Sequence, residues 1–201
     1  PDGRRIAFGW MGEFANPLGT QTDGWSGQLA IPRELTLDND LTLASTPVSE
    51  LSNLFASPTT HKYSLGADEG FEVSNIPASR ISVKVNLDKE VPLQVPTCEQ
   101  VVLSFTRGSS SATKLILDTL AGRVHLVYGD SNGAGHGYRS APWNPDEELT
   151  IYLDKGSIET FVGKGRETLS SLDFEGEGNR KLGVEAVNGP ADVTVDIATL
   201  T

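Results

Sequence analysis

Cysteine is almost absent from this chain, and its scarcity excludes two kinds of site. Cys98 is the only cysteine among 201 residues, so the chain can hold neither an internal disulfide nor a cysteine-rich zinc site. No segment is apolar over the length that a bilayer span needs. Hydrophobic residues still make up 37% of the sequence, which is typical of a soluble globular chain. We expect no membrane span, while the compartment stays open between cytoplasmic and secreted.

Basic residues are also scarce, with 16 lysines and arginines against 27 acidic residues and a net charge of −11. Such a surface repels phosphate backbones, so nucleic acid is excluded as a partner, whereas a neutral sugar is neither attracted nor repelled. The three histidines, His61, His125 and His136, are too dispersed to predict a metal site. The glycine-rich run at residues 129–137 opens no helix and so lacks the context of a phosphate cradle. We expect no cofactor.

The first residues, PDGRR, contain neither an initiating methionine nor the charged and apolar pattern of a signal sequence. We therefore expect the chain to be part of a longer protein. Residues 4–11 and 28–37 have strand-like patterns, and a long loop at residues 12–27 joins them. Loops of that length are uncommon in compact domains and are often functional.

One short helix is expected. After the apolar residues 41–44, Pro47 suits the first position of a helix over residues 47–56, with Val48, Leu51, Leu54 and Phe55 on one side. The breaker cluster at residues 57–60 then ends the helix and suggests a hinge. We place a domain boundary near residues 44–60.

The remainder predicts strand after strand. Nine alternating runs stand at residues 80–87, 99–105, 113–118, 123–128, 148–153, 157–162, 168–174, 182–187 and 193–200. Turn residues rich in glycine, asparagine, aspartate and serine separate nearly all of them, a pattern typical of an antiparallel two-sheet β-sandwich. The fold class is therefore all-β.

Three motifs resemble glycoside hydrolase family 32, which includes invertases, levanases, inulinases and sucrose-phosphate hydrolases. Residues 3–11, GRRIAFGWM, are similar to the family's strand G-R-R-I-x-x-G-W. Residues 24–35, GWSGQLAIPREL, are similar to the G-W-x-G-x-x-x-x-P-R-E-L run that follows it. Residues 149–161, LTIYLDKGSIETF, resemble the hairpin L-x-I-x-x-D-x-S-S-I-E-x-F, with Gly156 in place of the first serine. The resemblance covers almost the whole chain.

This resemblance implies the end of a five-bladed catalytic β-propeller at residues 1–44, a linker helix and hinge at 45–60, and a C-terminal β-sandwich at 61–201. It implies a parent enzyme that hydrolyses sucrose, levan or inulin with retention, using an aspartate nucleophile, a glutamate acid/base and a second aspartate. The family's W-M-N-D-P-N-G, R-D-P and E-C motifs have no counterpart here. We therefore expect the catalytic carboxylates and the rest of the propeller upstream, and no catalysis by this chain alone.

The resemblance also suggests contacts with the β-fructoside substrate. Trp10 is expected to face the fructosyl ring, since an aromatic face suits the C–H face of a sugar. Trp25 is expected either to contact substrate or to seat the loop. Glu13, Asn16 and Gln21 lie in that loop and can hydrogen-bond sugar hydroxyls.

Other polar residues have a plainer interpretation. Arg33 and Glu34 are expected to form a structural ion pair with each other. Asp154, Ser157 and Glu159 are interpreted as turn chemistry and a solvated strand face, with no ligand.

A second hypothesis treats the chain as a binding or structural module, because a β-sandwich fold does not fix function. The sandwich could bind fructan, mediate homo-oligomer formation, or only brace the propeller. Trp143 and Tyr138 are the only aromatic residues grouped in a predicted sandwich loop, and two rings make a small platform for a sugar. We therefore prefer the bracing role.

Overall fold

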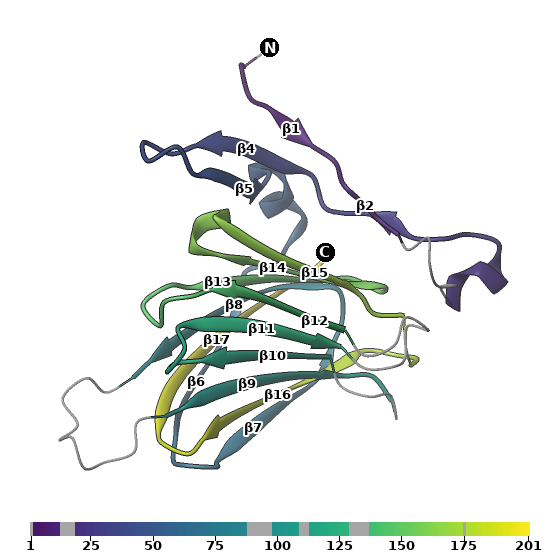
Figure 1. The fold of residues 1–201 in the computed structure, drawn as a ribbon. Helices are drawn as coiled ribbons and strands as arrows, with labels where there is room; N and C mark the ends of the chain where they lie inside the picture. Colours follow the sequence, from purple (N-terminus) through teal and green to yellow (C-terminus); the bar gives the residue numbers. More distant parts are fainter. Residues whose placement is uncertain (1, 13–18, 88–97, 109–112, 129–136, 175) are drawn as a thin grey trace.

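The computed structural model describes residues 2–12, 19–87, 98–108, 113–128, 137–174 and 176–201, and nearly all regular structure in them is β. Two six-stranded sheets pack face to face, and a small three-stranded sheet lies beside them (Figure 1). Every strand pair in both large sheets is antiparallel. The predicted antiparallel sandwich is therefore confirmed.

The first sandwich sheet has the order β12-β11-β10-β9-β16-β7. Its strands are β7 (Gly70–Ile76), β9 (Gln100–Thr106), β10 (Thr113–Asp118), β11 (Arg123–Tyr128), β12 (Gly137–Pro142) and β16 (Arg180–Val187). The second sheet has the order β15-β14-β13-β8-β17-β6. Its strands are β6 (Thr59–Leu65), β8 (Ser79–Asn86), β13 (Leu149–Leu153), β14 (Ser157–Val162), β15 (Glu167–Leu172) and β17 (Ala191–Thr199).

The core between the sheets follows from the alternation of side chains along each strand. In β8, every second residue from Ser79 to Val85 is buried, because successive side chains of a strand point to opposite faces. Both sheets contribute to one apolar cluster, whose members include Ile81, Val83, Leu103, Leu117, Leu126, Ile151 and Val195. Strand β14 departs from this rule, since all six of its residues are buried. Its outer face must therefore be covered from outside the sandwich.

The cover is the N-terminal segment, by which we mean residues 2–47. It forms a sheet of order β1-β4-β5, with β1 (Ile6–Ala7), β4 (Arg33–Leu37) and β5 (Leu43–Pro47). A separate pair joins β2 (Trp10–Met11) to β3 (Gln28–Leu29). The segment keeps a large apolar surface exposed, which includes Ile6, Phe8, Trp10, Leu29, Leu37, Leu41 and Leu43.

The nine sandwich strands that the sequence predicts are all present, and most of their ends lie within about two residues of the predicted positions. Three further strands, β6, β7 and β12, were not predicted. Strand β6 begins at Thr59, inside the cluster that was interpreted as a breaker. Strand β12 follows the glycine-rich run and ends at Pro142. All three lie at sheet edges, where one side of the strand has no hydrogen-bonded partner strand.

The short helix is confirmed as a 3-10 helix, η2 (Ser49–Leu54). Pro47 ends strand β5 and does not open the helix. The two strands expected in the N-terminal segment are each divided: β1 and β2 flank Phe8 and Gly9, while residues 30–32 separate β3 from β4. The expected long loop contains η1 (Gly19–Asp23). The division of the chain near residues 44–60 stays a prediction.

Candidate functional site

Trp10 lies in β2 opposite Leu29 of β3. A Cβ atom at Gly12 would come within 2.1 Å of its indole ring, and one at Gly27 within 2.6 Å of its Nε1 atom. Gly27 also has a φ of +72°, which residues with side chains rarely adopt. The two glycines leave the space that the indole occupies, while half of Trp10 stays exposed. Such a ring can stack on the apolar face of a sugar.

Trp25, at the other end of the loop, is attached to the sandwich. Its ring meets the ring of Phe174 edge-on, with centroids 5.5 Å apart. A Cβ atom at Gly156 would lie 2.1 Å from the Phe174 ring and 2.8 Å from the Gln28 side chain. The absence of a side chain at position 156 therefore lets Phe174 fold over the β13–β14 turn toward Trp25. Glu13 and Asn16 lie outside the described residues, and Gln21 is exposed in η1.

Arg33 joins the N-terminal segment to the outer face of the sandwich. Its Nη2 atom donates to Glu159 Oε2 at 2.6 Å and to Ser170 Oγ at 3.1 Å, and its Nη1 donates to Thr168 Oγ1 at 3.2 Å. The guanidinium also lies over the Phe161 ring, 5.1 Å from its centroid. These partners belong to β14 and β15, where Glu159 pairs with Ser170 and Phe161 with Thr168.

The expected ion pair between Arg33 and Glu34 is wrong. The two residues are neighbours in β4, so their side chains point to opposite faces of the sheet. Arg33 faces the sandwich, while Glu34 lies 3.9 Å from Arg4 of the N-terminal segment. Arg4 in turn forms a bidentate pair with Glu50 of η2, at 2.6 and 3.1 Å.

The expectation that Glu159 lies on a solvated face is also wrong. Its side chain is 2% exposed, because the N-terminal segment covers that face of β14. Besides the bond from Arg33, it accepts the backbone N–H of Ile31 at 2.9 Å. Ser157 is buried on the same strand. Only Asp154 remains exposed, and its carboxylate accepts the N–H of Lys155 as a turn residue does.

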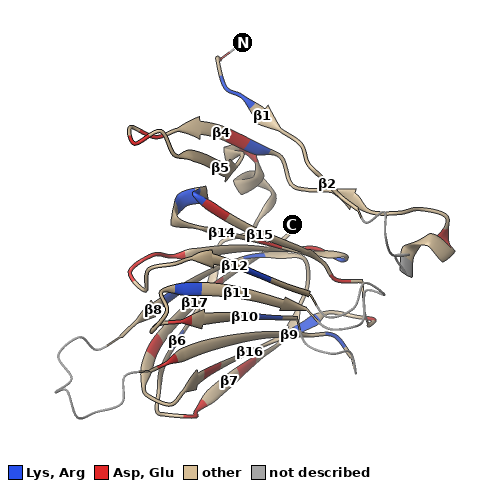
Figure 2. Ribbon diagram, viewed as in Figure 1, with Lys and Arg blue, Asp and Glu red and all other residues tan. Residues whose placement is uncertain are grey.

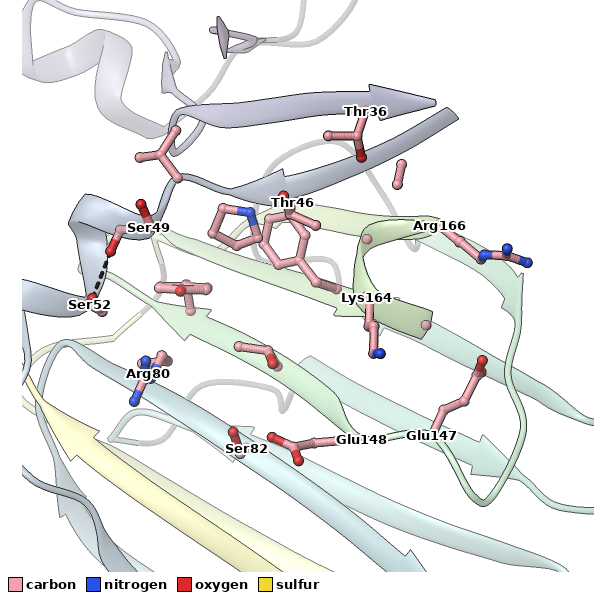
Figure 3. A pocket seen from close by; sticks show the side chains of 18 of the residues that line it. Thr36, Thr46, Ser49, Ser52, Arg80, Ser82, Glu147, Glu148, Lys164 and Arg166 are labelled. Carbon is pink, nitrogen blue, oxygen red and sulfur yellow. Dashed lines mark hydrogen bonds between the residues drawn. The ribbon is translucent and has the colours of Figure 1, made fainter. Parts of the chain in front are cut away.

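A groove of about 1330 Å³ runs between the N-terminal segment and the second sandwich sheet. Figure 3 shows Thr46 and Ser49 on one side and Arg80 and Glu148 on the other. The turn η4 (Gly163–Gly165) also lines the groove. Charged residues of both signs gather where the two parts face each other, including an acidic tip on the β4–β5 hairpin (Figure 2).

Aromatic rings line part of the groove. Tyr152 meets Phe161 and Phe55 edge-on, with centroids 5.9 and 5.8 Å apart, and burial raises the pKa of its hydroxyl. The nearby carboxylates are engaged: Glu148 pairs with Lys84 at 2.9 Å, which raises the pKa of that ammonium. Glu147 accepts the N–H of Asn144 at 3.1 Å. The groove thus offers rings, hydroxyls and paired charges.

At the tip of the β4–β5 hairpin, Arg166 bridges the sandwich to the N-terminal segment. Its guanidinium lies 2.8 Å from Asp38 and 3.3 Å from Asp40. Hydrogen bonding to Asp38 raises the pKa of Arg166. These side chains are partly exposed, so the contact is weaker than the buried one at Glu159.

The two aromatic residues considered as a sugar platform do not form one. Trp143 is only 3% exposed and belongs to the core, with its Nε1 donating to the carbonyl of Glu147 at 3.1 Å. Tyr138 is exposed in β12 and stacks on His125, to whose Nδ1 its hydroxyl is hydrogen-bonded at 2.7 Å. His136 lies outside the described residues, as does most of the glycine-rich run.

Among the described residues, no group of three or more histidine, cysteine, aspartate or glutamate side chains could hold a metal ion. The same part of the chain contains no helix with the length and apolar character of a membrane span.

Two family models match consecutive parts of the chain. The model described as "Glycosyl hydrolases family 32 N-terminal domain" matches residues 1–47, and "Glycosyl hydrolases family 32 C terminal" matches residues 50–201. The chain is 29% identical to a raffinose invertase from Escherichia coli over 197 residues, covering 96% of this chain and 39% of that protein. It is 30% identical to a sucrose-6-phosphate hydrolase from Zymomonas mobilis, covering 94% of this chain and 37% of that protein.

The fold is similar to that of an exo-inulinase from Aspergillus awamori, with a TM-score of 0.80 and 19% identity. That likeness covers 98% of this chain and 40% of the exo-inulinase chain. The chain spans less than half the length of both curated relatives.

Proposed function

Because the chain belongs to glycoside hydrolase family 32, we propose that it is the C-terminal portion of a retaining β-fructosidase that hydrolyses sucrose, levan or inulin. The observation that carries the proposal is the tandem match of both family domains, with the end of the first at residues 1–47 and the second at 50–201. The names of the relatives, an invertase and a sucrose-6-phosphate hydrolase, support β-fructoside substrates.

In this proposal the catalytic carboxylates lie upstream, and the chain alone is inactive. Retaining hydrolysis uses two carboxyl groups about 5 Å apart, one as nucleophile and one as acid/base. Glu159, the most buried carboxylate near the junction, already accepts hydrogen bonds from Arg33 and from the Ile31 N–H. Both of its oxygens are therefore already engaged in structural hydrogen bonds. Asp154 lies in an exposed turn, where its carboxylate accepts the backbone N–H of Lys155.

The N-terminal segment supplies contacts to the substrate in the propeller pocket of the parent. We assign Trp10 to the face of the fructosyl ring and Glu13 to its hydroxyl groups. We assign Trp25 to the outer rim of the pocket, and its ring contacts Phe174 of the sandwich. The sandwich braces these elements, and the exposed apolar surface of the N-terminal segment packs against the upstream part of the propeller.

The proposal is tested in the full-length enzyme with Trp10→Ala and Trp143→Phe. Trp10→Ala is expected to lower kcat/KM for sucrose about tenfold or more while the melting temperature stays near that of the wild type, since each ~1.4 kcal/mol of lost transition-state contact is a factor of ten. Trp143→Phe changes a core tryptophan outside the pocket and should leave kcat/KM within about twofold. Unchanged kcat/KM in Trp10→Ala would remove Trp10 from the pocket.

A second candidate function is a fructan-binding module without catalysis, and the groove is the observation that suggests it. Its rings and hydroxyls are of the kind that contact sugars, although its aromatic side chains mostly pack on one another. Calorimetric titration of residues 1–201 with inulin and levan separates the two cases. We expect no binding tighter than millimolar. A tighter constant that Arg80→Ala weakens would favour the binding module, and a dimer in sedimentation would favour an assembly role.

A further inference from the structure

Glu159 reaches across the junction and holds two residues of one short stretch of the N-terminal segment. Its Oε1 accepts the backbone N–H of Ile31 at 2.9 Å, and its Oε2 accepts Arg33 Nη2 at 2.6 Å. Ile31 lies in the link between β3 and β4, and Arg33 is the first residue of β4, so both held groups belong to the stretch that leads into β4. The Glu159 side chain thus accepts the Ile31 N–H in the place of a backbone carbonyl from a neighbouring strand.

From Ile31 the connection to Trp10 is short and runs through backbone hydrogen bonds. The preceding residue, Ala30, donates its N–H to the carbonyl of Gly9 at 2.8 Å. Leu29, one residue further back, is the strand partner of Trp10. A shift of Ile31 away from the sandwich would therefore also move the β2–β3 pair, which contains Trp10.

We propose that Glu159 is a positioning residue that sets the orientation of Trp10 from outside the catalytic domain. Its carboxylate fixes residue 31, the backbone transmits that position to Gly9, and Trp10 follows as the next residue. The link to catalysis rests on the proposed function, in which Trp10 faces the sugar. The structural statement, that Glu159 controls the setting of Trp10, stands apart from it.

The burial of the pair distinguishes Glu159 from the other contacts at the junction. The side chains of Glu159 and Arg33 are 2% and 17% exposed, and Thr168 and Ser170 fix the guanidinium further. In the Arg166–Asp38 pair, by contrast, the side chains are 47% and 37% exposed. Exposed pairs of that kind add little rigidity, whereas a buried carboxylate with a hydrogen bond to each oxygen is held in a defined geometry.

The experiment is fluorine NMR on residues 1–201 labelled with fluorotryptophan, which gives signals from Trp10, Trp25 and Trp143 that single Trp→Phe variants assign. The test variant is Glu159→Gln, which keeps the shape and removes the charge. The matched control is Arg166→Gln, which breaks an exposed ion pair at the same junction. We expect Glu159→Gln to shift or broaden the Trp10 signal and leave Trp143 in place, and Arg166→Gln to leave both unchanged.

An unchanged Trp10 signal in a folded Glu159→Gln variant, or an equal shift in Arg166→Gln, would overturn the proposal. If Glu159→Gln also disturbs Trp143, Glu159→Asp decides the matter. It retains the charge for Arg33 but shortens the reach to Ile31, so the Trp10 signal should move and the exchange rate of the Ile31 amide should rise. Failure of both to change would reject the positioning role.

Kinetics of the full-length enzyme then separate this inference from the proposed function. Glu159→Gln is expected to lower kcat about tenfold with a smaller effect on KM, since misplacing a positioning group by about 1 Å costs up to about 100-fold. A moved Trp10 signal with unchanged kcat and KM would keep the positioning role and remove Trp10 from the pocket. An unmoved signal with reduced kcat would reject the positioning role and leave the proposed function standing.

Discussion

Arg33 and Glu159, which are 126 residues apart in the sequence, form an ion pair of 2.6 Å that joins the N-terminal segment to the sandwich. The pair lies on the covered outer face of β14, a strand whose six residues are all buried. It also connects two of the motifs that resemble glycoside hydrolase family 32. The junction is therefore an integral part of the fold.

Removing one member of this pair should be costly. Glu159→Ala leaves the largely buried Arg33 guanidinium without its carboxylate partner and the Ile31 N–H without its acceptor, and we expect the free energy of unfolding in urea to fall by about 3–5 kcal/mol. The double variant Arg33→Met with Glu159→Leu should lose less, because it leaves no buried charge. Lys181→Ala, which breaks an exposed pair with Glu72, is the control and should change stability by less than about 1 kcal/mol. A loss in Glu159→Ala no larger than this control would contradict the prediction.

Glu50 should titrate far below the usual range of a glutamate. Its hydrogen bonds with Arg4 lower its pKa from 4.5 to about 2. Because the folded-state pKa is the lower one, the contact contributes stability above pH 4.5 and loses it as the pH falls from 4.5 toward 2. Carboxyl NMR of Arg4→Gln should show the titration midpoint of Glu50 returning toward 4.5. Arg5→Gln, which makes the same charge change at the next residue, should leave the Glu50 midpoint low. Equal midpoints in the two variants would argue against the contact.

Gly156→Ser should separate Phe174 from Trp25. A Cβ at position 156 would overlap the Phe174 ring at 2.1 Å, so the ring must move, and we expect a loss of about 1–3 kcal/mol. The fluorine signal of Trp25 should shift while that of Trp143 stays. Gly183→Ala is the control, because its nearest neighbour would lie 3.8 Å away. A Trp25 signal that does not respond to Gly156→Ser would show that the ring contact does not seat the loop.

Truncating a side chain in the sandwich core should lower the stability of the chain, because the core is closely packed. Leu117 is fully buried, and Leu117→Ala is expected to lower the free energy of unfolding by about 2–5 kcal/mol. Leu41, which is 76% exposed, supplies the same substitution outside the core, and Leu41→Ala should cost less than about 0.5 kcal/mol. Similar losses in both variants would mean that the sandwich does not carry the stability of the chain.

The sequence was most informative where strands alternate strictly. In β10 and β11 the predicted and observed ends coincide, because one face of each strand packs on the core and turn residues bound both ends. Edge strands such as β6 and β7 were missed. In β6 the exposed residues fall on both faces, so its sequence alternates little. Strand β7 does alternate, with Phe71 and Val73 packed against the core, and that pattern was not recognised in the sequence.

The roles of Arg33 and Glu159 could not be read from local pattern. A strand face that another part of the chain covers looks solvated when the strand is considered alone, and Glu159 has the appearance of an ordinary exposed glutamate between Ile158 and Thr160. The alternation of side chains does exclude a pair between Arg33 and Glu34, because adjacent residues of a strand point to opposite faces. The partner of Arg33 depends on a contact over more than a hundred residues, which requires the tertiary structure.

The most direct measurement is fructose release from sucrose and inulin by purified residues 1–201, with the full-length enzyme assayed in parallel. We predict release by the full-length enzyme and none above the buffer rate by residues 1–201, because contacts without a nucleophile and an acid/base do not cleave a glycosidic bond. Turnover by residues 1–201 that persists through repurification, and that disappears when one of their own carboxylates is replaced, would contradict the assignment of catalysis to the upstream propeller.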